Sequence, residues 1–70
     1  MSDVLAPMGG KIIKVLVNIG DSVSEDDELA ILEAMKMEMP IVSPGSGTVK
    51  EIKVKEGAAV QADEVILILS

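Results

Sequence analysis

The chain contains two copies of one sequence unit. Residues 6–32 and 43–69 align without a gap at a constant offset of 37 residues. Identical residues occupy 8 of the 27 aligned positions: Pro7/Pro44, Gly10/Gly47, Val17/Val54, Gly20/Gly57, Val23/Val60, Asp26/Asp63, Ile31/Ile68 and Leu32/Leu69. Proline, glycine and aspartate are typical turn residues, so these pairs indicate two copies of one turn-rich unit. A domain of this size cannot leave large parts of its chain idle, so we expect both copies to contribute to the fold.

Within each copy, short apolar segments alternate with turn signals. An alternating segment, residues 13–17 or 49–54, precedes a glycine turn, a lone valine, an acidic turn and a final apolar strand at 29–32 or 65–69. The chain has 9 Val and 8 Ile against 6 Leu, a bias that favours strands. The pattern predicts an all-β fold, a small sandwich or barrel. We expect a single domain over residues 1–70.

One segment also carries a helix signal. Residues 24–39 are rich in good helix formers, and Leu29, Leu32 and Met39 fall near helical spacing. The equivalent part of the second copy ends in Val-Ile-Leu-Ile-Leu, which is a strand by composition. Because two copies of one unit share a structure, we predict a strand before Lys36. The apolar strand at 65–69 lies near the C-terminus and is a candidate for an exposed sheet edge.

The residue types that are missing exclude several functions. The chain has no His, Cys, Phe, Trp or Tyr, and its net charge is −6. It therefore has no imidazole or thiol for catalysis, and no aromatic platform for nucleic-acid bases. The acidic residues 24–28 lack the spacing of a calcium loop, and we predict a turn there rather than a metal site. No apolar segment is long enough to span a bilayer, and residues 1–3 do not resemble a secretory signal. We expect a soluble cytoplasmic domain without catalytic residues, without nucleic-acid partners and without direct insertion into a membrane.

The linker between the copies centres on Lys36. If residues 29–34 pair with residues 37–42, the two strands form a hairpin whose two-residue turn is Met35-Lys36. Such turns favour Asn-Gly or Gly-Gly because they often require positive φ, so this turn is locally unfavourable. Turn chemistry that departs from the rule is typical of a functional site. A pseudo-twofold arrangement of the copies would place this turn at one end of the molecule and the chain termini at the other, with Lys36 uncrowded.

The segment Glu33-Ala34-Met35-Lys36-Met37-Glu38 resembles the biotin-attachment motif of biotin carboxyl carrier proteins. The resemblance to the biotinyl domain runs from Ala6 through Leu69. It implies a flattened antiparallel β-barrel of two quasi-twofold-related halves, with the attachment lysine on an exposed hairpin turn. It also implies that a biotin protein ligase acylates Lys36 with biotin, and that Glu33, Ala34, Met35 and Met37 form the turn that the ligase recognises. Met35 and Met37 could equally be core residues, and Met39 is expected in the core.

In this family the biotin arm carries a carboxyl group between active sites. The resemblance therefore implies biotin carboxylase and carboxyltransferase or decarboxylase subunits as partners, and tethering gives biotin a high effective concentration at each of them. Certain acetyl-CoA carboxylase carriers have an inserted thumb loop, for which the gap-free repeat leaves no room. This absence favours carriers of other biotin enzymes.

The nearest alternative is a lipoyl carrier domain of a 2-oxo-acid dehydrogenase type complex. Lipoyl domains resemble this chain but typically carry Asp-Lys-Ala at the turn, whereas methionines flank Lys36 here. Glycine-cleavage H proteins are related but longer. An unmodified interaction module or a purely structural β-domain also stays open, because only the motif at Lys36 argues against it.

Overall fold

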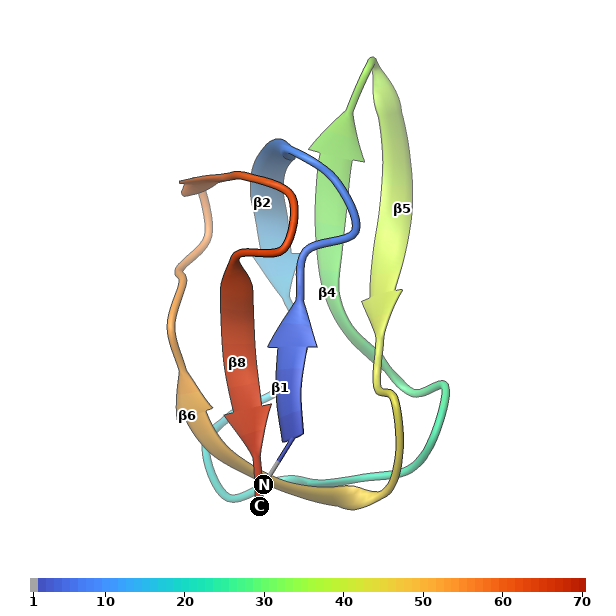
Figure 1. Ribbon diagram of the computed structural model, residues 1–70, viewed down its shortest axis with the longest axis vertical. Helices are drawn as coiled ribbons and strands as arrows, with labels where there is room; N and C mark the ends of the chain where they lie inside the picture. Colours follow the sequence, from blue (N-terminus) through green and yellow to red (C-terminus); the bar gives the residue numbers. More distant parts are fainter. Residues whose placement is uncertain (1) are drawn as a thin grey trace.

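Eight short strands make up the fold in a computed structural model that describes residues 2–70 (Figure 1). The strands are β1 Ser2–Leu5, β2 Gly10–Val15, β3 Ser22–Val23, β4 Glu28–Ala34, β5 Met37–Val42, β6 Gly47–Ile52, β7 Ala59–Val60 and β8 Val65–Leu69. The helix signal in residues 24–39 is overruled, because most of that segment forms β4 and the start of β5. Within residues 2–70 no helix could cross a membrane.

The strands form two antiparallel sheets with matching order. One sheet is ordered β1-β8-β6-β3 and the other β5-β4-β2-β7. Adding 37 to the residue numbers of β2 and β3 gives β6 and β7, and adding 37 to the first residue of β4 gives the first residue of β8. The same offset relates β1 to residues 39–42 of β5, a correspondence that lies outside the aligned copies. The predicted all-β fold of two quasi-twofold-related halves is confirmed.

The symmetry extends to the two acidic turns. The Asp26 N–H donates to the Ser43 carbonyl oxygen at 2.9 Å, and the Asp63 N–H donates to the Ala6 carbonyl oxygen at 2.9 Å. Both aspartates have positive φ, at 71° and 67°, a conformation that Asp tolerates better than most residues. Each acidic turn is therefore hydrogen-bonded to the first residue of the other copy, and these two acceptor residues, Ala6 and Ser43, are themselves related by the offset of 37.

A turn lies within residues 24–28, as predicted, and Glu28 already begins β4. The Ser24 N–H donates to Asp27 Oδ2 at 2.8 Å, and the Asp27 N–H donates to the Ser24 carbonyl oxygen at 3.0 Å. One oxygen of the Asp27 carboxylate therefore accepts a hydrogen bond from a nearby backbone N–H, as in a turn. Among residues 2–70, no group of three potential metal-ligating side chains comes together.

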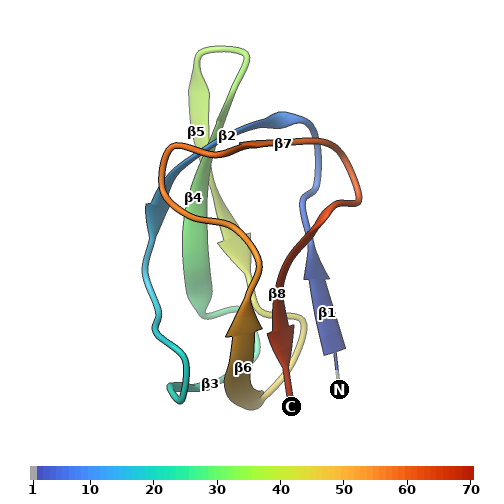
Figure 2. The same ribbon diagram turned by 90° about the vertical axis from the view of Figure 1, so that its left-hand side faces the viewer.

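The two halves exchange their shortest strands. β3 pairs with β6, and β7 pairs with β2, so each two-residue strand completes the sheet built mainly by the other half. Figure 2 shows both crossings, with β7 running beside β2 and β3 beside β6. Val23 and Val60, the lone valines of the repeat, are buried at these crossings. Because each half contributes a short strand and a buried valine to the sheet of the other, the two halves share one core.

The expectation of an exposed edge at residues 65–69 is wrong. β8 lies between β1 and β6 and pairs with both of them. Ile66, Leu67 and Leu69 are fully buried, and a strand this apolar is stabilised most in the interior of a sheet. The edge strands are β1 and β3 in one sheet and β5 and β7 in the other. β5 contains Pro40, which an edge strand tolerates.

A single apolar core fills the space between the sheets. Its residues come from both halves and are almost all Val, Ile, Leu or Ala: Val4, Ala6, Ile12, Val23, Leu29, Ala30, Leu32, Ile41, Val49, Val60, Ile66, Leu67 and Leu69. Met39 is partly buried and packs against this core, as expected from the sequence. The core supports the base of the β4–β5 hairpin.

Candidate functional site

The β4–β5 hairpin has the predicted two-residue turn. Its last register pair is Ala34↔Met37, which leaves Met35 and Lys36 as the turn residues. Their φ angles are 53° and 63°. Two successive positive φ values are the signature of a type I′ turn, which fits the right-handed twist of paired strands. The unfavourable turn inferred from the sequence is therefore present.

The turn is the most protruding part of the molecule. Figures 1 and 2 show the β4–β5 hairpin extending past the other strands at one end, with the start of β1 and the end of β8 at the opposite end. The molecule measures 30 × 19 × 18 Å, and the hairpin lies along its long axis. This is the placement that the pseudo-twofold argument predicted.

The turn side chains project into solvent. Met35 is 85% exposed and Met37 is 62% exposed, so neither is a core residue. Lys36 is also exposed, and its Nζ makes no hydrogen bond or ion pair with any of residues 2–70. Ala34 differs from them, because it is only 7% exposed and packs beneath the turn. The structure thus presents the primary amine of Lys36 between the exposed thioether side chains of Met35 and Met37, next to the buried Ala34.

Gly10 fixes the base of the hairpin in a way that the sequence did not reveal. Its position in the repeat suggested a turn, but Gly10 begins β2 and lies against β4. A Cβ at this position would overlap the carbonyl oxygen of Glu33 and would lie 3.2 Å from the Cβ of Ala34. The equivalent Gly47 would clash in the same way with the Ser70 carbonyl oxygen, at 2.8 Å. Both glycines serve close strand approach, which periodicity cannot detect.

The surface below the turn is acidic. Glu33 and Glu38 are direct register partners across the hairpin, and both are exposed. Like charges placed directly opposite each other destabilise a strand pair. Lys11 is the register partner of Glu33 on β2 and offsets part of this repulsion. Lys36 is therefore a cation at the tip of a hairpin whose second register pair below the turn, Glu33 and Glu38, is negative.

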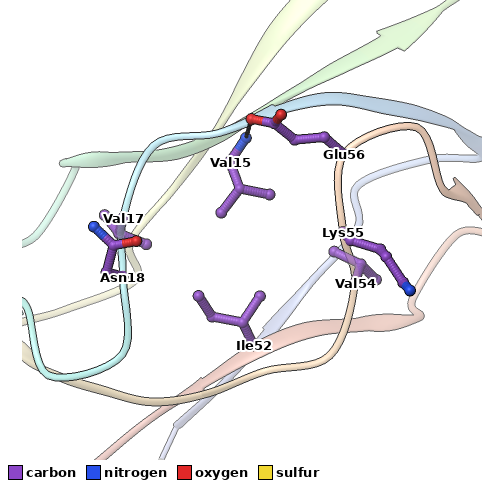
Figure 3. A pocket seen from close by; sticks show the side chains of 7 residues that line it. All are labelled: Val15, Val17, Asn18, Ile52, Val54, Lys55 and Glu56. Carbon is purple, nitrogen blue, oxygen red and sulfur yellow. Dashed lines mark hydrogen bonds between the residues drawn. The ribbon is translucent and has the colours of Figure 1, made fainter.

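A shallow groove of about 450 Å³ lies elsewhere, at the junction of the two halves (Figure 3). It is lined by Val15, Val17, Asn18, Ile52, Val54, Lys55 and Glu56. The Glu56 carboxylate points to the β2 backbone and accepts a hydrogen bond from the Val15 N–H at 3.1 Å. No hairpin residue lines this groove. Its lining combines four aliphatic side chains with Asn18, Lys55 and Glu56, and it lies away from the amine at the turn.

The chain is similar to proteins that are named as biotin carrier or biotin attachment proteins. A family model described as "Biotin-requiring enzyme" matches residues 2–69. The "Biotin carboxyl carrier protein" of Streptococcus mutans is 52% identical over 65 residues, which cover 93% of this chain and 50% of that protein. The "Biotin/lipoyl attachment protein" of Bacillus subtilis is 52% identical over 63 residues, which cover 90% of this chain and 86% of that protein.

A solved structure shows the same architecture. The urea carboxylase of Kluyveromyces lactis contains a region that matches 99% of this chain with a TM-score of 0.93 and 30% sequence identity. That region is 6% of the yeast enzyme. The chain therefore corresponds to half of the streptococcal carrier and to a small part of the large carboxylase.

Proposed function

The chain belongs to the biotin-requiring enzyme family, and from this premise we propose that it is a biotin carrier domain with Lys36 as its attachment residue. The observation that carries the assignment is the position of Lys36. It stands at the tip of the protruding hairpin, exposed and without a partner among residues 2–70. A modifying enzyme must surround its target side chain, and this geometry allows such access. The domain acts as a carrier rather than as an enzyme.

Attachment forms an amide between the lysine amine and the carboxyl group of biotin. The lysine ammonium first loses one proton, and the neutral amine then attacks the carbonyl carbon of biotinyl-adenylate. AMP leaves, and the nitrogen loses one further proton to solvent or base, so that the amide keeps one N–H. No side chain among residues 2–70 contacts Lys36 Nζ as a base, so we assign activation to a biotin protein ligase. The amide removes one positive charge and changes the formal net charge from −6 to −7.

The neighbours of Lys36 have different proposed roles. Met35, Met37 and Glu33 are exposed and form the surface that the ligase contacts. Ala34 is buried and acts by holding the turn on the core. Attached biotin supplies the group that accepts and releases a carboxyl group. The hairpin keeps this arm away from the body of the domain, so that it can enter the active sites of other proteins.

The proposed partners follow from the relatives. One relative is named as a carboxyl carrier protein and a structural neighbour is a carboxylase. We therefore propose biotin carboxylase and carboxyltransferase or decarboxylase components as partners, besides the ligase. We also propose that residues 1–70 act as one domain in the cytoplasm. The lack of cysteine supports this location, because small domains of oxidising compartments typically rely on disulfides.

The test is intact mass after incubation with a biotin protein ligase, biotin and ATP. We expect the wild-type chain to gain one biotin less one water and Lys36→Arg to gain nothing. Lys14→Arg, which alters an exposed lysine on β2, is the matched control and should gain the same mass as wild type. A gain that persists in Lys36→Arg would refute the site. No gain from biotin, but one lipoyl unit from a lipoyl ligase, would assign the domain to lipoyl carriers instead.

A further inference from the structure

The side chains of the exposed methionines that flank Lys36 lie outside the core. Met35 and Met37 are 85% and 62% exposed, whereas Met8 and Met39 are partly buried against the core. Methionine is an apolar residue that normally fills gaps in a core. Met35 and Met37 lie in solvent on either side of Lys36, so they gain little stabilisation from apolar burial. Their side chains are accessible to small reagents.

We propose that Met35 and Met37 form an oxidation site for hydroperoxides, and that their oxidation switches off the modification of Lys36. The first part rests on exposure alone. The second part rests on the proposed function. The two parts have separate readouts, described below.

The oxidation step needs no side chain besides the methionine. The thioether sulfur attacks one oxygen of a hydroperoxide, an S–O bond forms, and the O–O bond breaks. The sulfur loses two electrons, the peroxide gains them, and hydrogen peroxide leaves as water. Because this reaction depends on access to sulfur, we expect Met35 and Met37 to react before Met8 and Met39.

Oxidation should change the hairpin surface without unfolding it. The sulfoxide is polar and chiral, so two apolar side chains beside Lys36 become polar ones. Neither side chain belongs to the core, and the hairpin remains held by the buried Ala34 and the partly buried Met39. A ligase surface that fits apolar thioethers would have to desolvate the new sulfoxide oxygens. We expect the rate of Lys36 biotinylation to fall about tenfold, the effect of leaving one polar group buried without a partner.

The experiment treats the full chain with dilute hydrogen peroxide and follows each methionine by peptide mass spectrometry. Circular dichroism checks that the fold persists, and the biotinylation rate is then measured with a biotin protein ligase. The variant carrying Met35→Leu and Met37→Leu should show the same rate before and after peroxide. After peroxide treatment, the control carrying Met8→Leu and Met39→Leu should show the same fall in the rate of Lys36 biotinylation as the wild type. Methionine sulfoxide reductases should restore the rate of the oxidised wild type.

The outcomes separate the switch from the proposed function. If Met8 and Met39 oxidise as fast as the flanking pair, the oxidation site is refuted. If the oxidised wild type is biotinylated at an unchanged rate, the switch is refuted alone. If reductase treatment fails to restore the rate, the loss does not come from methionine and the switch is also refuted. If the untreated chain is not biotinylated at all, the proposed function fails and the switch fails with it, while the order of oxidation stands as a separate result.

Discussion

At the scale of single residues, the turn of the hairpin has a backbone conformation that its side chains do not favour. Met35 and Lys36 have φ values of 53° and 63°, in a region where a side chain with a Cβ costs roughly 1 kcal/mol or more. Asparagine or glycine would fit both positions better. Retaining methionine and lysine there sacrifices stability, as residues at functional sites often do.

Met35→Asn should therefore stabilise the domain. Met35 is largely exposed, so the substitution loses little apolar burial, and asparagine accepts positive φ more readily. We expect the free energy of unfolding to rise by roughly 0.5–1 kcal/mol, measured by urea denaturation. The control is Met37→Asn, which lies in β5 outside the turn and should bring no gain. An unchanged or lower stability of Met35→Asn would contradict the strain argument.

At the scale of elements, the hairpin depends on how closely β2 approaches β4. Gly10 lies where any Cβ would overlap the backbone of Glu33 and crowd Ala34. The overlapping atom is a backbone carbonyl, so a rotamer change cannot relieve the clash. The position of β4, and of the turn at its end, is therefore linked to one glycine on a neighbouring strand.

Gly10→Ala should destabilise the domain by roughly 1–3 kcal/mol, the usual cost of overpacking a core. Gly45→Ala is the matched control, because a Cβ there meets nothing within 4 Å and Gly45 has no positive φ. That variant should change stability by no more than about 0.5 kcal/mol. Thermal unfolding of the two variants gives the comparison. Equal stabilities would show that β2 and β4 can separate without cost.

At the scale of the whole molecule, the exchange of β3 and β7 makes the halves interdependent. Each two-residue strand pairs only with a strand of the other half, and each buries a valine there. A half separated from its partner would lose this pairing and expose its core face. The repeat therefore describes one cooperative unit rather than two small ones.

Peptides of residues 1–36 and 37–70 should each be unfolded in isolation. Each lacks the sheet neighbours that the other half supplies, and a chain of this length buries too little apolar surface to fold. Circular dichroism and amide chemical-shift dispersion measure the result, with the intact chain as reference. Cooperative thermal unfolding of either peptide alone would show that a half can form its own core.

The sequence by itself determined the features that rest on local pattern. Turn residues repeated at an offset of 37 predicted two related β halves, and the residues around Lys36 predicted the hairpin and its unfavourable turn. The tertiary structure decided what depends on residues far apart in the chain. It placed the apolar β8 inside its sheet, added β1 as the partner of that strand, exchanged β3 and β7, and gave Gly10 and Gly47 their roles in close approach. Turn chemistry acts over a few neighbouring residues, whereas strand order and steric fit arise only when distant segments pack against each other.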